Sequence, residues 1–203
     1  MYDSGIIIGS FNPFHFGHLG IINLGLNYFE NLDIYIGKRN KPDRLPRHLR
    51  TKLVKTMIDK EELNDRVKIV ESNKAIELNG SLYSGTICGS DLLNIIVSQN
   101  PKFRQKYHKY FSSFKRIIAV QRYGKKLDYN AKEILNNNLD LIVLQQISPL
   151  SATYLRELVK QDKNIRQFVP GCVREIISDN LSYYSKASET NYVSYISLTH
   201  LWL

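Results

Sequence analysis

Short apolar runs rich in Ile, Val and Leu alternate along the chain with stretches whose apolar residues recur at helical spacing. Apolar runs bounded by turn residues are typical of buried strands. They predict strands at residues 6–8, 33–37, 67–70, 82–88, 116–120 and 139–144. The helical stretches predict helices at residues 20–29, 48–57 and 103–115 and a further helix after residue 150. Strands that alternate with helices in this way indicate an α/β fold with a mostly parallel sheet.

The linker at residues 72–80 is the one departure from this alternation. It shows no helical pattern, and a crossover between parallel strands takes a dozen or more residues. Two interpretations stay open. Either the strand after the linker is antiparallel, or that strand is misplaced in the prediction.

Length, charge and cysteine content define the class of protein. We expect one domain over residues 1–184 and a tail at residues 185–203 in the chain of 203 residues. The net charge of +9 suggests a polyanionic partner, although a generally high Lys content explains it equally well. Cys88 and Cys172 show no metal-ligand or disulfide pattern, so a reducing, cytoplasmic location is the default expectation. No run of about 18 apolar residues predicts a membrane span.

The first predicted strand leads into a turn that carries two histidines. Residues 9–18 read GSFNPFHFGH. In α/β folds the N–H groups of such a turn and of the following helix point toward one position and bind an anion. His15 and His18 stand three residues apart, a spacing that can put both imidazoles on one side of the helix entrance. We therefore predict a phosphate site at these histidines. Its turn residues are Gly9, Ser10, Phe11 and Asn12.

A second anion position is predicted where the last strand ends. Residues 149–156 read PLSATYLR, in which a Ser or Thr cap opens a helix. The backbone N–H groups around Ala152, the hydroxyls of Ser151 and Thr153, and the guanidinium of Arg156 would converge on an anion.

The strand at residues 82–88 leads directly into Gly89-Ser90-Asp91. A carboxylate at the end of a parallel strand lies over the ligand crevice, where Asp91 could accept hydrogen bonds from ribose hydroxyls. Alternatively, Ser90 or Asp91 caps the next helix. Both interpretations can hold at once.

Together these motifs resemble the nucleotidyltransferase superfamily with its His-x-Gly-His signature. The superfamily includes the mononucleotide adenylyltransferases of NAD synthesis and phosphopantetheine adenylyltransferase. The resemblance runs from about residue 5 to about residue 184, with a gap near 72–80, and residues 9–18 match without substitution at key positions. Residues 150–156 are similar to the motif Ile-Ser-Ser-Thr-x-Ile-Arg, with Ala152 in place of the second Ser.

The resemblance implies a Rossmann-like, doubly wound sheet followed by a small C-terminal helical part over residues 165–184. The segment from Gly89 to Asp91 resembles the mononucleotide adenylyltransferases, although no Trp follows it. By the same resemblance Arg122 is a further ligand candidate. Arg50 matches an Arg of the family and is expected to be partly structural.

The implied reaction joins the AMP moiety of ATP to nicotinate or nicotinamide mononucleotide and releases pyrophosphate. The resemblance gives His18 contact with the α-phosphate and His15 a hold on the triphosphate. Ser151, Thr153 and Arg156 would hold the leaving phosphates. Mg²⁺ would bridge phosphate oxygens with mostly water ligands. ATP and a pyridine mononucleotide are thus the expected partners, with His15, His18 and Arg156 as the catalytic residues.

Two other functions stay open. One is phosphopantetheine adenylyltransfer or cytidylyl transfer within the same superfamily. The other is non-catalytic binding of a nucleotide or RNA, because residues 103–115 interleave basic and aromatic side chains. An amphipathic helix with a solvated face explains that stretch better, so no specific nucleic acid partner is expected. Whether the chain forms a homo-oligomer is open.

Overall fold

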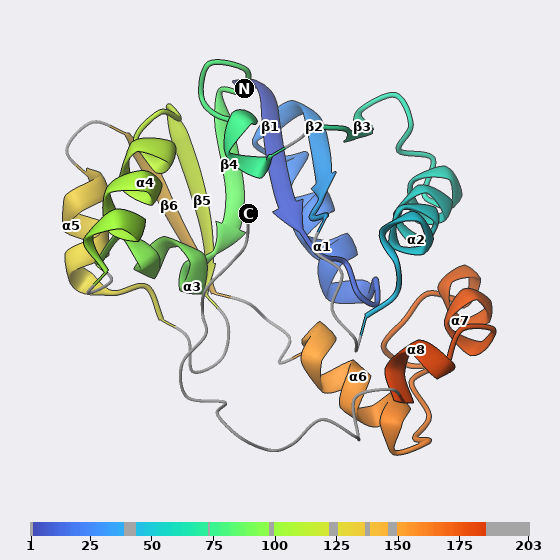
Figure 1. Cartoon of the computed structure of the whole chain (residues 1–203). Helices are drawn as coiled ribbons and strands as arrows, with labels where there is room; N and C mark the ends of the chain where they lie inside the picture. Colours follow the sequence, from blue (N-terminus) through green and yellow to red (C-terminus); the bar gives the residue numbers. More distant parts are fainter. Residues whose placement is uncertain are drawn as a thin grey trace. The chain divides into compact units, whose positions relative to one another are not determined.

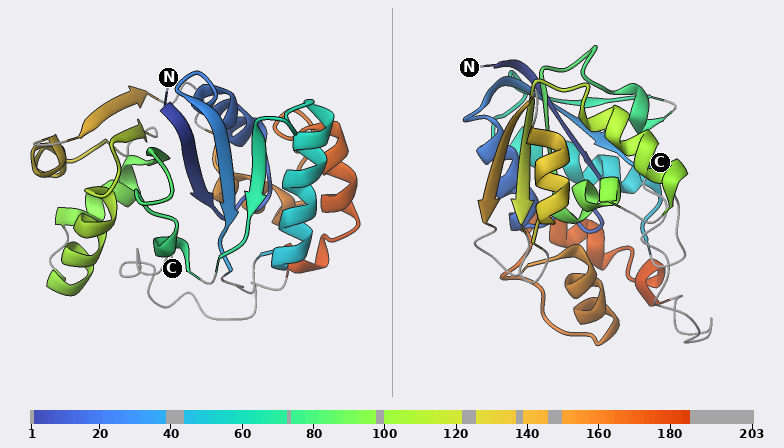
Figure 2. Two further views of the ribbon diagram at one scale, coloured as in Figure 1. Left: turned by 90° about the horizontal axis from the view of Figure 1, so that it is seen from above. Right: turned by 90° about the vertical axis from the view of Figure 1, so that its left-hand side faces the viewer.

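The computed structural model describes residues 2–38, 44–72, 74–97, 100–121, 126–136, 139–145 and 150–185. Within these residues a six-stranded sheet has the order β3-β2-β1-β4-β5-β6 (Figure 1). The strands are β1 (Tyr2–Gly9), β2 (Phe29–Ile36), β3 (Val67–Val70), β4 (Gly85–Gly89), β5 (Arg116–Gln121) and β6 (Asp140–Gln145). β1 pairs with β4, β4 with β5 and β5 with β6, all in parallel (Figure 2).

The strand order confirms the predicted doubly wound α/β fold. β1, β2 and β3 follow one another from the middle of the sheet to one edge. β4 lies on the other side of β1, and β5 and β6 follow it to the opposite edge. The order therefore reverses between β1 and β4. In open α/β sheets, ligands bind outside the carboxyl ends of the strands at such a reversal.

The crossover from β3 to β4 decides between the two interpretations of the linker. β4 is parallel to β1, with Gly5 opposite Gly85, so the antiparallel alternative is wrong. β4 begins at Gly85, three residues later than predicted, and the connection spans residues 71–84. That length suffices for a parallel crossover. The described residues of this connection, 71–72 and 74–84, contain one 3₁₀ turn, η1 (Ala75–Glu77), and no α-helix, which explains why no helical pattern is present.

Helices connect the strands and follow the last of them (Figure 1). They are α1 (Phe16–Gly25), α2 (Arg47–Lys60), α3 (Ser90–Leu93), α4 (Pro101–Phe111), α5 (Tyr129–Asn136), α6 (Ala152–Lys160), α7 (Gly171–Ser178) and α8 (Ser182–Ser185), with a 3₁₀ turn, η2 (Asn94–Val97), after α3. The sequence pattern did not predict α5. Among residues 129–135 of this helix only Ala131 and Leu135 are buried, and two apolar residues four apart make a weak pattern.

The chain divides into two compact units. The first unit comprises Met1–Ile8, Ile21–Tyr35 and Val70–Pro149, and the second comprises Gly9–Gly20, Ile36–Ile69 and Leu150–Leu203. The second unit thus collects the histidine turn, α2 and the C-terminal helices. Segments far apart in the sequence meet in it, whereas the later strands and their connections form one continuous stretch of the first unit.

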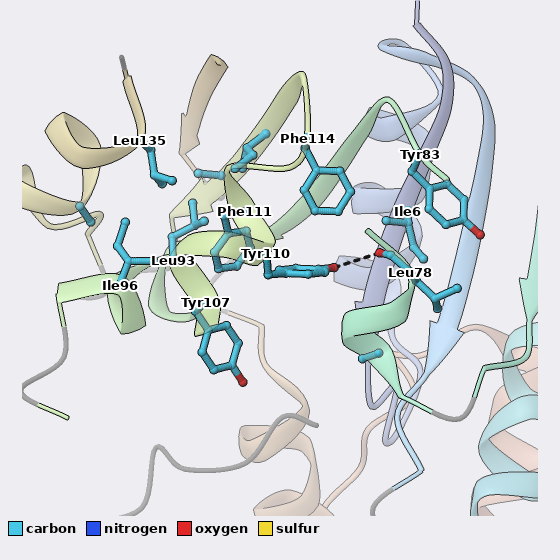
Figure 3. Packing of buried hydrophobic residues seen from close by; sticks show 14 of the residues in the cluster. Ile6, Leu78, Tyr83, Leu93, Ile96, Tyr107, Tyr110, Phe111, Phe114 and Leu135 are labelled. Carbon is cyan, nitrogen blue, oxygen red and sulfur yellow. Dashed lines mark hydrogen bonds between the residues drawn. The ribbon is translucent and has the colours of Figure 1, made fainter. Parts of the chain in front are cut away.

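A cluster of aromatic and aliphatic side chains forms the core of the first unit (Figure 3). Phe111 is fully buried, and its ring centroid lies 5.1 Å from that of Tyr110. The hydroxyl of Tyr110 donates a hydrogen bond to the Leu78 carbonyl at 3.3 Å, so the ring is buried without an orphaned polar atom. Tyr107, Tyr110 and Phe111 all come from α4, while Lys102, Arg104, Lys106 and Lys109 of the same helix are exposed. The prediction of an amphipathic helix with a solvated basic face is confirmed.

Candidate active site

The histidine turn lies between β1 and α1 and belongs to the second unit. Phe11 is 2% exposed and adopts a positive φ of 50°. A Cβ atom on Gly9 would lie 2.9 Å from the Phe11 ring, so only glycine allows this ring to pack against the strand end. The Gly37 N–H donates to the Gly9 carbonyl at 2.9 Å and joins the turn to the residue after β2.

His15 and His18 are stacked on each other, an arrangement that their spacing allows. Their ring centroids are 3.7 Å apart with an interplanar angle of 26°. His15 immediately precedes α1 and is 4% exposed, whereas His18 lies in the first turn of α1 and is half-buried. A Cβ atom on Gly17 would lie 2.9 Å from Cε1 and Nδ1 of His15. The glycine between the two histidines therefore makes room for the His15 ring against the helix.

One hydrogen bond fixes the tautomer of neutral His18. The backbone N–H of His15 donates to Nδ1 of His18 at 3.3 Å. Because Nδ1 accepts, the ring proton of the neutral imidazole is on Nε2. The rings of Phe11 and Phe14 stand at 5.0 and 5.5 Å from the His18 ring and confine it. The result is a held imidazole with an N–H donor at Nε2.

Asn12 is a fully buried junction of three chain segments. Its Oδ1 accepts the backbone N–H of Leu45 at 3.2 Å and the hydroxyl of Tyr184 at 3.3 Å. Its backbone carbonyl accepts an N–H of Arg156 at 2.9 Å. Among the described residues, its Nδ2 has no hydrogen-bond partner.

Arg156 connects the two predicted anion positions. Its side chain comes from α6 and is 7% exposed. Besides the bond to Asn12, it donates from Nη2 to Oγ1 of Thr153 at 3.2 Å. Ser151 is the N-cap of α6, and its Oγ accepts the Tyr154 N–H at 3.2 Å, while Ala152 is the first residue of the helix. The predicted helix opening is therefore present, and Arg156 ties it to the histidine turn.

Arg50 supports the same turn from α2. It is fully buried, donating from Nε to the Leu45 carbonyl at 2.9 Å and from Nη1 to the carbonyls of Ser10 (3.1 Å) and Gly37 (2.9 Å). Burial and the nearby Arg44 and Arg47 lower the pKa of Arg50 to about 10, so the guanidinium keeps its charge at neutral pH. Three main-chain carbonyls therefore converge on one cation, which confirms the expected structural part of its role.

Gly89 and Asp91 belong to the first unit, whereas the residues described so far belong to the second. Gly89 ends β4 in the first unit and is the N-cap of α3, with no side-chain capping bond. The prediction that Ser90 or Asp91 caps this helix is therefore wrong, because α3 already begins at Ser90. Asp91 is exposed in the first turn, where the helix dipole favours a carboxylate. Arg122 lies outside the described residues.

Two contacts of the turn have no signal in the sequence. Tyr184 lies 172 residues from Asn12 along the chain, and the contribution of Leu45 is a backbone N–H that any residue except proline carries. Within the described part of the chain, no three His, Cys, Asp or Glu side chains gather in a way that could hold a metal ion. No helix in that part is both long and apolar enough to cross a membrane.

Residues 6–158 match the model of the cytidylyltransferase-like family. This match covers most of the chain, so the protein belongs to that family, and the predicted nucleotidyltransferase resemblance is confirmed. Two curated relatives are each named a probable nicotinate-nucleotide adenylyltransferase. The one from Fusobacterium nucleatum is 26% identical over 181 residues, which are 83% of this chain and 93% of the relative. The one from Pseudothermotoga lettingae is 26% identical over 196 residues, 89% of this chain and 96% of the relative.

A solved structure of similar fold is the Plasmodium falciparum nicotinic acid mononucleotide adenylyltransferase complexed with NaAD. The TM-score is 0.69 at 18% identity, and the match covers 90% of this chain and 98% of the other. At this identity the match establishes the shared fold.

Proposed function

We propose that the protein transfers the AMP moiety of ATP to nicotinate mononucleotide or nicotinamide mononucleotide and releases pyrophosphate, a step of NAD synthesis. The observation that carries the proposal is the stacked pair of His15 and His18, in the same unit as an Arg156 that is anchored on Asn12. Membership of the cytidylyltransferase-like family and the names of the curated relatives support adenylyl transfer to a pyridine mononucleotide.

The reaction is an in-line attack by a phosphate oxygen of the mononucleotide on the α-phosphorus of ATP. The new P–O bond forms as the bond to the pyrophosphate oxygen breaks. Because the attacking oxygen is already anionic at neutral pH, the protein needs no general base and no nucleophile of its own. Catalysis can rest on positioning and on stabilising developing charge.

In this proposal His18 donates from Nε2 to an oxygen of the α-phosphate as negative charge develops there. His15, stacked against it, holds the triphosphate. Arg156, which is anchored on Asn12 and Thr153, would hold the β- and γ-phosphates. The N–H groups of the first turn of α6, around Ala152, would add to this second position.

The remaining contacts are also proposals. The backbone of Gly9, Ser10 and Phe11, together with Asn12, would line the ATP site. Gly89 and Asp91 would also contact the nucleotide, with the Asp91 carboxylate on ribose hydroxyls. Arg122 would be a further ligand of the nucleotide.

Mg²⁺ would arrive with the triphosphate and neutralise part of its charge. Phosphate oxygens and water would supply its ligands. We also propose that the protein acts on free nucleotides in the cytoplasm, with no specific nucleic acid partner.

The test is pyrophosphate release from ATP and Mg²⁺ with one phosphate acceptor at a time. Nicotinate mononucleotide or nicotinamide mononucleotide should support release, and the dinucleotide should appear in equal amount. Release only with 4′-phosphopantetheine, or only with CTP as donor, would place the activity elsewhere in the superfamily. Nucleotide binding without release with any acceptor would make the protein a non-catalytic binder.

A further inference from the structure

We propose that Tyr184 of α8 is a positioning residue for the nucleotide site. Its hydroxyl would hold the Asn12 side chain, and with it the histidine turn, in the conformation that binds ATP. The inference rests on the proposed function and adds to it a residue at the far end of the described chain.

Tyr184 is buried in α8. α8 is one short turn, Ser182–Ser185, and the Leu181 that precedes it is 45% exposed. Tyr184 nevertheless has no exposed surface. α6 and α8 are in contact, so the helix that carries Arg156 and the helix that carries Tyr184 form one assembly within the second unit (Figure 1). A tyrosine buried this completely needs a partner for its hydroxyl.

The hydroxyl of Tyr184 has Asn12 as a partner. The Tyr184 hydroxyl lies 3.3 Å from Oδ1 of Asn12. The same Oδ1 accepts the backbone N–H of Leu45, and a backbone N–H can only donate, so the atom facing both groups is an oxygen. Tyr184 is therefore the donor. With two donors on one oxygen, the Asn12 amide is held in a single orientation.

Asn12 in turn contacts Arg156, a residue of the proposed chemistry. The backbone carbonyl of Asn12 accepts the Nη1 hydrogen bond of Arg156, and His15 lies three residues further along the turn. One hydroxyl thus contacts the residue on which Arg156 is anchored.

The experiment compares Tyr184→Phe with Tyr183→Phe, the same change at the adjacent position, which is only partly buried. The measured quantity is the Kd of a non-hydrolysable ATP analogue by calorimetry, with kcat and the KM for ATP measured beside it. Tyr184→Phe keeps the ring and removes only the hydroxyl. We expect Kd and KM to rise about threefold to tenfold, the range of one neutral hydrogen bond, with kcat changed less than about twofold. Tyr183→Phe should leave all three unchanged.

A double-mutant cycle separates positioning from general stabilisation. In an Asn12→Ala background, Tyr184→Phe should raise Kd no further, because its acceptor is already gone. An unchanged Kd in Tyr184→Phe, or equal effects in both backgrounds, would overturn the proposal. If Tyr184→Phe does not fold, Asn12→Ala alone is decisive: it removes the acceptor, and a Kd equal to that of the wild type would overturn the proposal.

The readout also distinguishes this proposal from the proposed function. A wild-type chain that binds the analogue and makes the dinucleotide establishes the function whatever Tyr184 does. A wild-type chain that binds no ATP analogue would overturn both. Equal binding by wild type and Tyr184→Phe would overturn only the role of Tyr184.

Discussion

The interiors of the two units are held by different kinds of interaction. In the first unit, the rings of Tyr110, Phe111 and Phe114 pack edge to face with centroids 5.1 to 5.2 Å apart. In the second unit, the buried cations Arg50 and Arg156 donate hydrogen bonds to main-chain carbonyls. Apolar burial is non-directional and scales with area, whereas hydrogen bonds fix the positions of particular atoms.

This difference indicates that the two interiors have different roles. Transfer of a nucleotidyl group by positioning requires hydrogen-bond donors held at fixed places, and in the proposed function the polar interior of the second unit would supply them. The aromatic core of the first unit provides stability without fixing any reacting atom. Mutations in the aromatic core of the first unit should therefore change stability alone, and mutations of the buried polar residues around the histidine turn should change nucleotide binding or catalysis.

The largest effect is expected from Phe111→Ala in the aromatic core. Phe111 is fully buried, and its loss leaves a cavity that costs about 3–5 kcal/mol of unfolding free energy. Urea unfolding measures this loss. Tyr129→Ala in α5, where the ring is 70% exposed, is the control and should change stability by less than about 0.5 kcal/mol. The folded fraction of Phe111→Ala should keep the wild-type KM for ATP, and a changed KM would contradict this difference in roles.

His18→Ala should reduce kcat by roughly 10²–10³, or about 2.7–4 kcal/mol of barrier, since it removes one preorganised donor. The KM for ATP should change far less, because the donor stabilises charge that develops only in the transition state. Steady-state kinetics at saturating Mg²⁺ measure both quantities. His48→Ala, at an exposed histidine of α2, is the matched control. Near-normal turnover in folded His18→Ala would reject the role proposed for His18.

Arg50→Lys tests whether the polar interior serves stability and binding together. An ammonium group cannot reach the three carbonyls that the guanidinium joins, so buried acceptors lose a charged donor. We expect a loss of about 1.5–3 kcal/mol in stability and a raised KM for ATP. Arg66→Lys, at an exposed position of the same unit, serves as the comparison in thermal unfolding and kinetics. A loss of stability with an unchanged KM would mean that Arg50 supports only the fold.

Arg156→Ala should have the smallest effect, and mainly on binding. If Arg156 holds the β- and γ-phosphates equally in the ground and transition states, its loss raises the KM for ATP more than it lowers kcat. A rise of about tenfold, or about 1.4 kcal/mol, is expected. Arg156→Lys should recover part of it, because an ammonium keeps the charge without the bidentate geometry. An unchanged KM in Arg156→Ala would mean that α6 is only a capped structural helix.

Local pattern alone predicted most of the fold. The β3 strand at residues 67–70 was predicted with its observed bounds, and the spacing of His15 and His18 indicated that both imidazoles can lie on one side of the helix entrance. Apolar runs predict strands because the buried positions of a strand carry apolar side chains. Residues three or four apart on a helix are neighbours, so their spacing predicts which side chains can lie together. The missed helix α5 has few buried residues, whereas the predicted start of β4 was too early because the apolar residues Leu82 and Tyr83 precede the strand.

The details of the candidate site depended on the tertiary structure. The sequence indicated that Arg156 and the histidine turn serve one site, but not that Asn12 joins them or that Tyr184 holds Asn12. Nor did it show that Arg50 donates hydrogen bonds to backbone carbonyls. The physical reason is the nature of these contacts: hydrogen bonds between residues far apart in sequence, several to main-chain atoms that every residue possesses, leave no periodicity along the chain.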